Sequence, residues 1–211
     1  MNRVFIKICG ITCLDDAALA VAAGADALGF NFFSPSPRCI SPQEAAGITA
    51  HLASNTLKIG VFVDPSAEEV RATVRLAGLD LAQIHGRVPP VSVRFWQALA
   101  AGPDLENQLQ IALRSNAAEA SIPEAFLIDT PAGAQRGGTG RAFDWSLVRG
   151  LPGRIVLAGG LDAGNVAQAI REARPWGVDA CSRLESAPGR KDPAKMRAFI
   201  QAVRAAELQE E

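Results

Sequence analysis

The sequence is poor in the residues that mark several large classes of protein. Its 211 residues include only four cysteines and two histidines, and the formal net charge is -1. The cysteines form no CxxC pair and show no framework spacing, so we expect neither a metal site nor a disulfide scaffold. The basic residues are scattered along the chain, whereas a nucleic-acid-binding protein gathers them into a positive surface. These shortages favour a small-molecule substrate.

Long apolar runs are also missing. Stretches such as residues 17–30 are interrupted by Gly24 and Asp26, and a membrane helix needs roughly 18 apolar residues in a row. The chain starts with a strand-like run, where a secretory signal would place charged and then apolar residues. Together with the cysteine pattern, this leads us to expect a cytoplasmic protein that binds neither a membrane nor a nucleic acid. For its oligomeric state the sequence leaves both a monomer and a homodimer open.

Short apolar, β-branched runs alternate with amphipathic stretches from end to end, which is typical of βα units that build a parallel sheet. Eight such units close into a (β/α)8 TIM barrel with its active site at the C-terminal ends of the strands. The length suits a single domain over residues 1–211. We expect strands at Val4–Cys9, Ala27–Phe32, Leu57–Val63, Leu81–His85, Ser92–Leu99, Ala125–Asp129, Ile155–Ala158 and Val178–Ser182.

Signals for helix starts support this arrangement. Ser41 precedes a proline and is followed three residues later by Glu44, which is the pattern of a capping box. Thr12 and Ser66 begin similar patterns, and Asp192 stands before another proline. Each expected helix therefore begins a few residues after a strand.

One connection is short, and one other topology competes with the barrel. Only residues 86–91 separate the fourth and fifth expected strands, so we expect the fourth helix to be absent or shortened. An open doubly wound sheet also alternates strands and helices, but its G-x-G-x-x-G turn is missing after the first strand. The barrel is the better prediction.

A thiol and an amine are expected on one wall of the barrel mouth. Cys9 ends the first strand with its side chain inward, and two-residue alternation puts Lys7 on the same face one layer below. A nearby cation lowers a thiol pKa from its reference of about 8.5 and so favours a thiolate base. Two alternatives stay open: Cys9 is only a small buried hydrophobic residue, or Lys7 is a nucleophile that forms a Schiff base.

Asp129 closes the apolar run of residues 125–128, so a carboxyl group stands where the sixth strand enters the mouth. Apolar walls tend to keep a carboxyl protonated, as a general acid must be, although a cap for the following loop is the plainer role. That loop contains Gly138 within the glycine-rich residues 137–140, which suit a mobile lid over the substrate.

Two further groups suit an anionic substrate. Gly159 and Gly160 follow the seventh strand, and Ser182 and Arg183 follow the eighth, where barrels commonly bind phosphate through backbone N–H groups. The double glycine is otherwise an ordinary tight turn. A side chain at Arg183 would be strained if the backbone there needed a positive φ.

Arg38 and His85 complete the set of candidate binding residues. Arg38 is carried on a proline-stiffened loop, and its guanidinium fits a carboxylate. His85 ends the fourth strand, where it either polarises a substrate or satisfies a neighbour by hydrogen bonding.

Taken together, these segments resemble the phosphoribosylanthranilate isomerase family. The first-strand motif Lys7–Thr12 is similar to that of the family, and the similarity covers nearly the whole chain, weakest from Arg87 to Ala120. The other segments that carry it, in order and spacing, are Gly24–Phe30, Ser36–Arg38, Gly60–Val63, Gln83–Gly86, Leu127–Thr130, Gly137–Gly140, Phe143–Trp145, Leu157–Leu161, Asn165–Val166, Glu185–Gly189 and Lys191–Asp192.

The resemblance implies a barrel enzyme of tryptophan biosynthesis that catalyses the Amadori rearrangement of N-(5-phosphoribosyl)anthranilate without a metal or an organic cofactor. It implies Cys9 as the general base, Asp129 as the general acid and Arg38 as the contact for the anthranilate carboxylate. Two other functions remain as alternatives: an aldolase or decarboxylase that uses Lys7, and a non-catalytic barrel that binds a sugar phosphate. A binder would need neither Cys9 nor Asp129.

Several positions depart from the family. Cys181 and Arg183 stand where the family commonly has small residues, often a serine and a glycine or alanine. Cys39 stands where an aromatic residue is frequent, and Arg87 replaces an acidic residue. These changes should affect the geometry of the last phosphate loop most.

Overall fold

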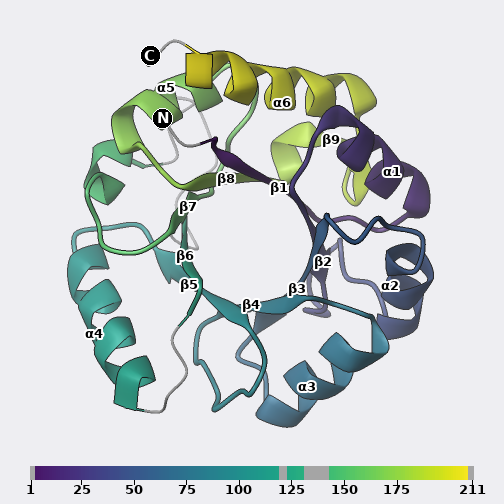
Figure 1. The fold of residues 1–211 in the computed structure, drawn as a ribbon, viewed down its shortest axis with the longest axis horizontal. Helices are drawn as coiled ribbons and strands as arrows, with labels where there is room; N and C mark the ends of the chain where they lie inside the picture. Colours follow the sequence, from purple (N-terminus) through teal and green to yellow (C-terminus); the bar gives the residue numbers. More distant parts are fainter. Residues whose placement is uncertain (1–2, 119–122, 131–142, 209–211) are drawn as a thin grey trace.

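The computed structural model describes residues 3–118, 123–130 and 143–208. Within these ranges eight parallel strands form a closed barrel in chain order, surrounded by helices (Figure 1). The predicted (β/α)8 barrel is therefore confirmed. The strands are β1 (Phe5–Cys9), β2 (Ala27–Asn31), β3 (Leu57–Val63), β4 (Leu81–His85), β5 (Phe95–Ala100), β6 (Ala125–Asp129), β7 (Ile155–Leu157) and β8 (Gly177–Ala180).

The outer layer is incomplete on one side, as the short connection predicts. Residues 86–94, all of them described, run from β4 to β5 without a helix (Figure 1). After β8 comes a small antiparallel hairpin, β9 (Glu185–Ala187) and β10 (Arg190–Lys191). The helices are α1 (Leu14–Ala23), α2 (Pro42–Thr49), α3 (Ala67–Leu76), α4 (Leu105–Ala118), α5 (Val166–Ala173) and α6 (Pro193–Leu208), with 3-10 turns η1 (Trp145–Val148) and η2 (Ser182–Leu184).

Three of the four predicted helix starts are confirmed. Ser41 and Glu44 form a capping box on α2, Ser66 accepts from Glu69 N–H on α3, and Asp192 accepts from the first N–H groups of α6. The prediction for Thr12 is wrong, because α1 begins after Cys13 and the Thr12 hydroxyl donates instead to Gly189 O at 2.5 Å. A hydroxyl near a helix start caps it only when no better acceptor lies within reach.

Strand alternation separates two cores. Side chains that point into the barrel pack against one another in its centre, whereas those that point outward pack against the helices. The inner cluster consists of Ala27, Ile59, Leu81, Trp96, Ala98, Ala125, Leu127, Val156 and Ala158. Apolar residues thus fill the middle of the barrel, and polar side chains are displaced toward its mouth.

The end of β8 differs from the sequence prediction. We expected the strand to run to Ser182, but it ends at Ala180, and the backbone turns at Cys181 (φ -136°, ψ -90°) into η2. The turn brings the hairpin of β9 and β10 back over the end of β1. This turn places side chains at the mouth that strand alternation does not anticipate.

The last helix holds the first strand in the ring. Arg204 Nη1 of α6 donates to Val4 O at 2.8 Å, and Val4 N–H donates to Glu207 Oε1 at 2.6 Å. Because β1 also pairs with β8, the first strand and the last helix lie on the same side of the barrel (Figure 1).

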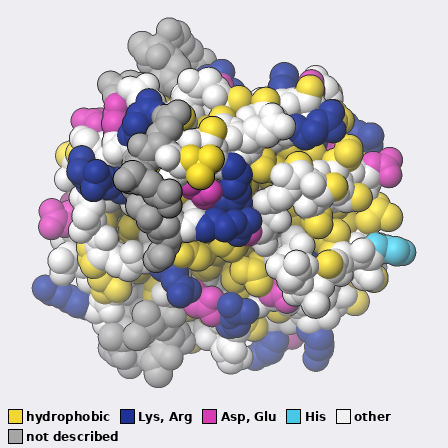
Figure 2. All heavy atoms as spheres, turned by 45° about the horizontal axis from the view of Figure 1, so that its top comes forward, with side chains coloured by type: hydrophobic (Ala, Val, Ile, Leu, Met, Phe, Trp, Pro, Cys, Tyr) yellow, Lys and Arg dark blue, Asp and Glu magenta, His cyan; other side chains and the backbone are white. Residues whose placement is uncertain are grey.

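The charged side chains on one face of the molecule are mixed in sign. Figure 2 shows Lys and Arg side chains dispersed over the visible face, with Asp and Glu between them and no continuous basic field. In the described part of the chain, none of the helices has the length and hydropathy needed to cross a bilayer.

Candidate active site at the barrel mouth

Lys7 and Cys9 lie next to each other inside the barrel, as alternation along β1 predicts. A Cβ atom placed on Gly29 of β2 would lie 2.7 Å from Cys9 Sγ and 3.0 Å from Lys7 Nζ. The thiol and the ammonium therefore fill the same space over Gly29, where only a residue without a side chain fits. Cys9 is 8% exposed and Lys7 is fully buried, so the thiol is the nearer of the two to the opening.

A carboxylate that the sequence analysis did not single out neutralises Lys7. Asp179 of β8 lies directly across from Lys7 in the sheet, and its Oδ1 is 2.9 Å from Lys7 Nζ. Burial by itself lowers the pKa of Lys7, but attraction to Asp179 outweighs burial and raises the pKa above its ordinary value. A lysine held as an ammonium has no free electron pair for a carbonyl, which argues against the Schiff-base alternative.

The Cys9 thiol is acidic for a buried cysteine. The neighbouring Cys181 thiol is the largest influence on its pKa and lowers it, burial raises it, and the Lys7 ammonium lowers it again. The result is a pKa of about 7. Near neutral pH a large share of Cys9 is therefore thiolate, which is the form that acts as a base.

Arg38 reaches the mouth but already has a partner. Its Nε donates to Glu185 Oε1 at 2.8 Å and its Nη2 donates to Glu185 Oε2 at 2.7 Å. The Arg38 side chain passes over Gly10, where an added Cβ would lie 2.7 Å from Arg38 Cδ and where φ is +74°. Glu185 thus fixes the guanidinium above the end of β1 through its Nε and Nη2 atoms.

Glu185 is itself shared between two cations. Lys191 Nζ, fully buried, lies 2.9 Å from Glu185 Oε1, and Lys191 N–H donates to Asp16 Oδ2 at 2.8 Å. Hydrogen bonds to Arg38 and Lys191 together outweigh the effect of burial and lower the pKa of Glu185. The cluster of Arg38, Glu185 and Lys191 therefore stays charged, with one positive charge in excess.

Asp129 lies at the end of β6, two strands away from β8 around the ring (Figure 1). Its Oδ1 accepts from Thr130 N–H at 2.7 Å and would lie 3.0 Å from a Cβ on Gly159. Gly159, at φ +89°, follows β7 and packs against Thr130 without room for a side chain. The structure thus puts the carboxyl group beside the double glycine, as both follow neighbouring strands.

The predicted phosphate residues form two adjoining loops. Gly159 and Gly160 both have positive φ, and Gly160 O is held by the Asn165 amide at 2.9 Å. Arg183 Nη1 lies 3.7 Å from Asp162 Oδ2, which links the loop after β7 to the loop after β8. Arg183 is not among the non-glycine residues with positive φ, so its side chain causes no backbone strain.

His85 is uncharged at neutral pH. Burial is the main cause and the Lys7 charge adds to it, and together they lower its pKa to about 4. Its Nε2 lies 2.8 Å from Gln83 Nε2, two residues earlier on the same strand. An amide nitrogen can only donate, so Nε2 of the imidazole accepts and the ring proton is on Nδ1. His85 satisfies a neighbour, and its Nδ1–H is a donor.

Other expectations for the site concern the glycine-rich loop, metal ligands and residues that the sequence did not reveal. Gly138 and its glycine-rich loop fall outside the described residues. Within the described residues, no cluster of three or more His, Cys, Asp or Glu side chains could hold a metal ion. Alternation along the eighth expected strand could have identified Asp179, but Glu185 and Lys191 carry no comparable signal because they come from the hairpin that folds back over β1.

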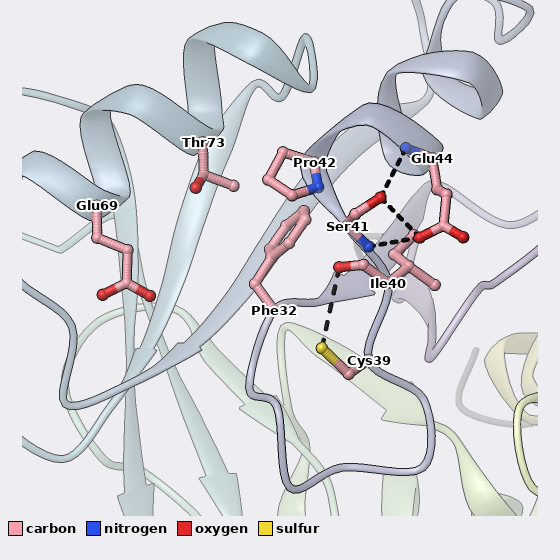
Figure 3. A pocket seen from close by; sticks show the side chains of 8 residues that line it. All are labelled: Phe32, Cys39, Ile40, Ser41, Pro42, Glu44, Glu69 and Thr73. Atoms are coloured by element: carbon pink, nitrogen blue, oxygen red, sulfur yellow. Dashed lines mark hydrogen bonds between the residues drawn. The ribbon is translucent and has the colours of Figure 1, made fainter.

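A pocket elsewhere contains none of the predicted site residues. It lies between the helices α2 and α3, outside the barrel, and has a volume of about 410 Å³ (Figure 3). Its Ser41 and Glu44 are engaged in the capping box, and Cys39 Sγ donates to Ile40 O at 3.9 Å. The candidate site is therefore the barrel mouth.

Fold and site define this chain as a (β/α)8-barrel enzyme with a buried thiol and a carboxyl group at the C-terminal ends of its strands. Residues 6–202 match the family model described as N-(5'phosphoribosyl)anthranilate (PRA) isomerase. The chain is 44% identical over 207 residues to the N-(5'-phosphoribosyl)anthranilate isomerase of Solibacter usitatus, covering 96% of this chain and 98% of that protein. The chain belongs to the N-(5'-phosphoribosyl)anthranilate isomerase family.

Solved structures agree with this assignment. The phosphoribosyl anthranilate isomerase of Thermotoga maritima superposes with a TM-score of 0.84 at 34% identity, covering 96% of this chain and 99% of that one. A phosphoribosyl anthranilate isomerase in complex with reduced 1-(o-carboxyphenylamino)-1-deoxyribulose 5-phosphate gives a TM-score of 0.81 at 33% identity, with the same coverage. The similarity extends over the whole barrel.

Proposed function

We propose that this chain converts N-(5'-phosphoribosyl)anthranilate into 1-(2-carboxyphenylamino)-1-deoxyribulose 5-phosphate, an Amadori rearrangement in tryptophan biosynthesis. Family membership supports the reaction. The observation that supports the residue assignment is the position of Cys9 and Asp129 at the C-terminal ends of β1 and β6, on different sides of one mouth. A substrate that lies across the mouth can then meet an acid and a base in turn.

Asp129 is the general acid in this proposal. Its protonated carboxyl group gives a proton to the ring oxygen of the ribose, and the bond between that oxygen and C1 breaks. The lone pair of the anthranilate nitrogen forms a double bond to C1, so that the ring opens to an iminium ion. Asp129 is left as a carboxylate, stabilised by the Thr130 N–H that its Oδ1 already accepts.

Cys9 is the general base. Its thiolate removes the proton from C2, and the electrons of that bond form the enolamine and neutralise the iminium nitrogen. The C2 hydroxyl then loses its proton while C1 gains one, which gives the ketone. No atoms are gained or lost, and the steps require no metal, oxidant or organic cofactor.

Binding residues hold the two ends of the substrate. Arg38, fixed by Glu185, is proposed to contact the anthranilate carboxylate through the part of its guanidinium that Glu185 does not use. Backbone N–H groups of Gly160, Ser182 and Arg183, together with Gly159 and Gly138, are proposed for the phosphate. Lys7 stabilises the thiolate, and His85 offers its Nδ1–H to a substrate oxygen.

The remaining features of the proposal concern the whole chain. We propose one domain over residues 1–211, acting in the cytoplasm as a monomer or a homodimer. Free cysteines in the active site agree with a reducing compartment.

A turnover assay that follows the loss of substrate fluorescence tests the proposal. We expect conversion by the purified protein, unchanged by EDTA, and failure of turnover in Asp129→Asn while a product analogue still binds. Asp15→Asn makes the same chemical change at an exposed position of α1 and serves as the control. Loss of activity with EDTA would reject the cofactor-free reaction, and parallel loss of binding and turnover in Asp129→Asn would reject its role as the acid.

A further inference from the structure

Cys181 is a side chain at the mouth to which the mechanism gives no role. It comes directly after β8, and the register that pairs Lys7 with Asp179 and Ile8 with Ala180 brings it opposite Cys9. The two thiols influence each other: Cys181 lowers the pKa of Cys9, and Cys9 raises the pKa of Cys181. Cys181 Sγ would also lie 2.8 Å from a Cβ on Gly10, so the sulfur fills the space beside the turn that follows β1.

The hairpin after β8 holds Cys181 in this place. Lys191 Nζ donates to Cys181 O at 3.2 Å and lies 3.8 Å from its Sγ. The Cys181 S–H donates to Glu185 Oε1 over a long distance of 3.9 Å. Cys181 is therefore packed between the base and the cluster that fixes Arg38.

The charges around the pair decide which thiol keeps its proton. Cys9 shares its space with the Lys7 ammonium, beyond which lies Asp179, and it also senses Lys191 and Arg38. Cys181 faces the Glu185 carboxylate, and the two cations near it are already bound to that carboxylate. The negative charge is thus better placed on Cys9, and the neighbouring Cys9 raises the pKa of Cys181 well above its ordinary value.

We propose that Cys181 is a positioning residue for the base: its S–H leaves the long contact with Glu185, donates to Cys9 Sγ and stabilises the thiolate at neutral pH. The inference rests on the proposed function, in which Cys9 is the base. A hydrogen bond to the charged form of an acid favours that form, and in a buried site the effect is larger than in water. In this role Cys181 acts through Cys9.

An NMR titration with isotopically labelled cysteine tests the proposal, because the Cβ shift of each cysteine reports its own ionisation. In Cys181→Ala we expect the pKa of Cys9 to rise by about one unit toward the ordinary thiol value of about 8.5. The thiolate fraction at pH 7 then falls about five-fold from the wild-type value, at which the pKa is about 7. The acid limb of the pH profile of kcat/KM, which reports the free enzyme, should move upward by the same amount, with little change at high pH.

Two further variants separate this role from a structural one. Cys181→Ser keeps a hydroxyl donor and should restore the wild-type pKa of Cys9 and the wild-type pH profile. Cys39→Ala removes a half-buried thiol that lies outside the proposed site and should change neither.

The proposal is overturned if the pKa of Cys9 is unchanged in Cys181→Ala, or if the low pKa belongs to Cys181. These results do not depend on turnover. A Cys9→Ala variant that remains active would instead reject the base, whatever the titration shows, so the two failures can be told apart.

Discussion

The two ends of the barrel are formed by the same strands but from different chemistry. At the N-terminal end, Phe5 and Trp176 stack with ring centroids 4.6 Å apart, and Trp96 meets them edge-on at 5.8 and 6.1 Å. At the C-terminal end the inward side chains are Lys7 with Asp179, and Cys9 with Cys181. One end is closed by aromatic rings, and the other is an open, charged mouth.

Residues that stabilise the fold and residues that react therefore lie at opposite ends of the same strands. The aromatic end needs only volume and contact, because burial of large rings stabilises a fold wherever they fit together. The mouth holds charges that burial disfavours, and each is acceptable only because a partner comes from a neighbouring strand or hairpin. Mutations at the two ends should therefore have opposite consequences.

The largest effect on stability is expected for Trp96→Ala at the aromatic end. Trp96 is 2% exposed and contacts both other rings, so its removal should lower the free energy of unfolding by about 3–5 kcal/mol. Urea denaturation measures the change, and kcat per folded molecule should stay near the wild-type value. Ile111→Ala, at a side chain 55% exposed on α4, is the control and should cost much less. A large loss of kcat in folded Trp96→Ala would show that the aromatic end also contributes to catalysis.

The converse experiment is Cys9→Ala at the mouth. Loss of the base should lower kcat by about 10²-fold or more, while the urea midpoint stays close to that of the wild type. Cys39→Ala, as above, should leave kcat unchanged. Turnover near the wild-type rate in Cys9→Ala would show that another group removes the C2 proton.

A smaller effect is expected for Arg38→Met. The fold should tolerate the change, because Lys191 still neutralises Glu185. The lost charge-assisted hydrogen bond should raise KM for substrates with the anthranilate carboxylate by about 10- to 100-fold, and analogues without that carboxylate should be affected far less. Arg87→Met, at an exposed arginine after β4, is the matched control. Equal weakening of both substrates would show that Arg38 does not bind the carboxylate.

The smallest effect is expected for Arg183→Gly, at the edge of the mouth. Arg183 is exposed and its guanidinium lies 3.7 Å from Asp162, so any added attraction for the phosphate is partly neutralised and screened by salt. We expect KM for the phosphorylated substrate to rise several-fold and to depend less on ionic strength. An unchanged KM with an unchanged salt response would mean that backbone groups alone bind the phosphate.

The sequence predicts the strands well because a strand buried on both faces is a short, nearly continuous apolar run. The positions of Lys7, Cys9 and Asp129 followed from this pattern, since alternation and strand ends decide which side chains reach the mouth. The cap on α1 did not follow, because Thr12 found an acceptor at Gly189, more than a hundred residues away. A local sequence pattern cannot predict a contact between residues so far apart in the chain.

The partners of the site residues were the part that sequence reasoning could not supply. Glu185 and Lys191 reach Arg38 and Cys181 only because the chain turns at Cys181 and folds back as a hairpin. The role of Cys181 was likewise hidden, because in the sequence it is an isolated cysteine next to a strand. Its position beside Cys9 depends on the register between β1 and β8.

The contacts of Arg204 and Glu207 with Val4 have one more consequence. They join the last helix to the first strand, and β1 and β8 are neighbours in the sheet. The eight units thus form a closed ring. The packing of this ring does not depend on which two neighbouring units lack a covalent connection. A circularly permuted chain that joins the present ends and opens in the helix-free segment between β4 and β5 would keep every strand pair of the barrel.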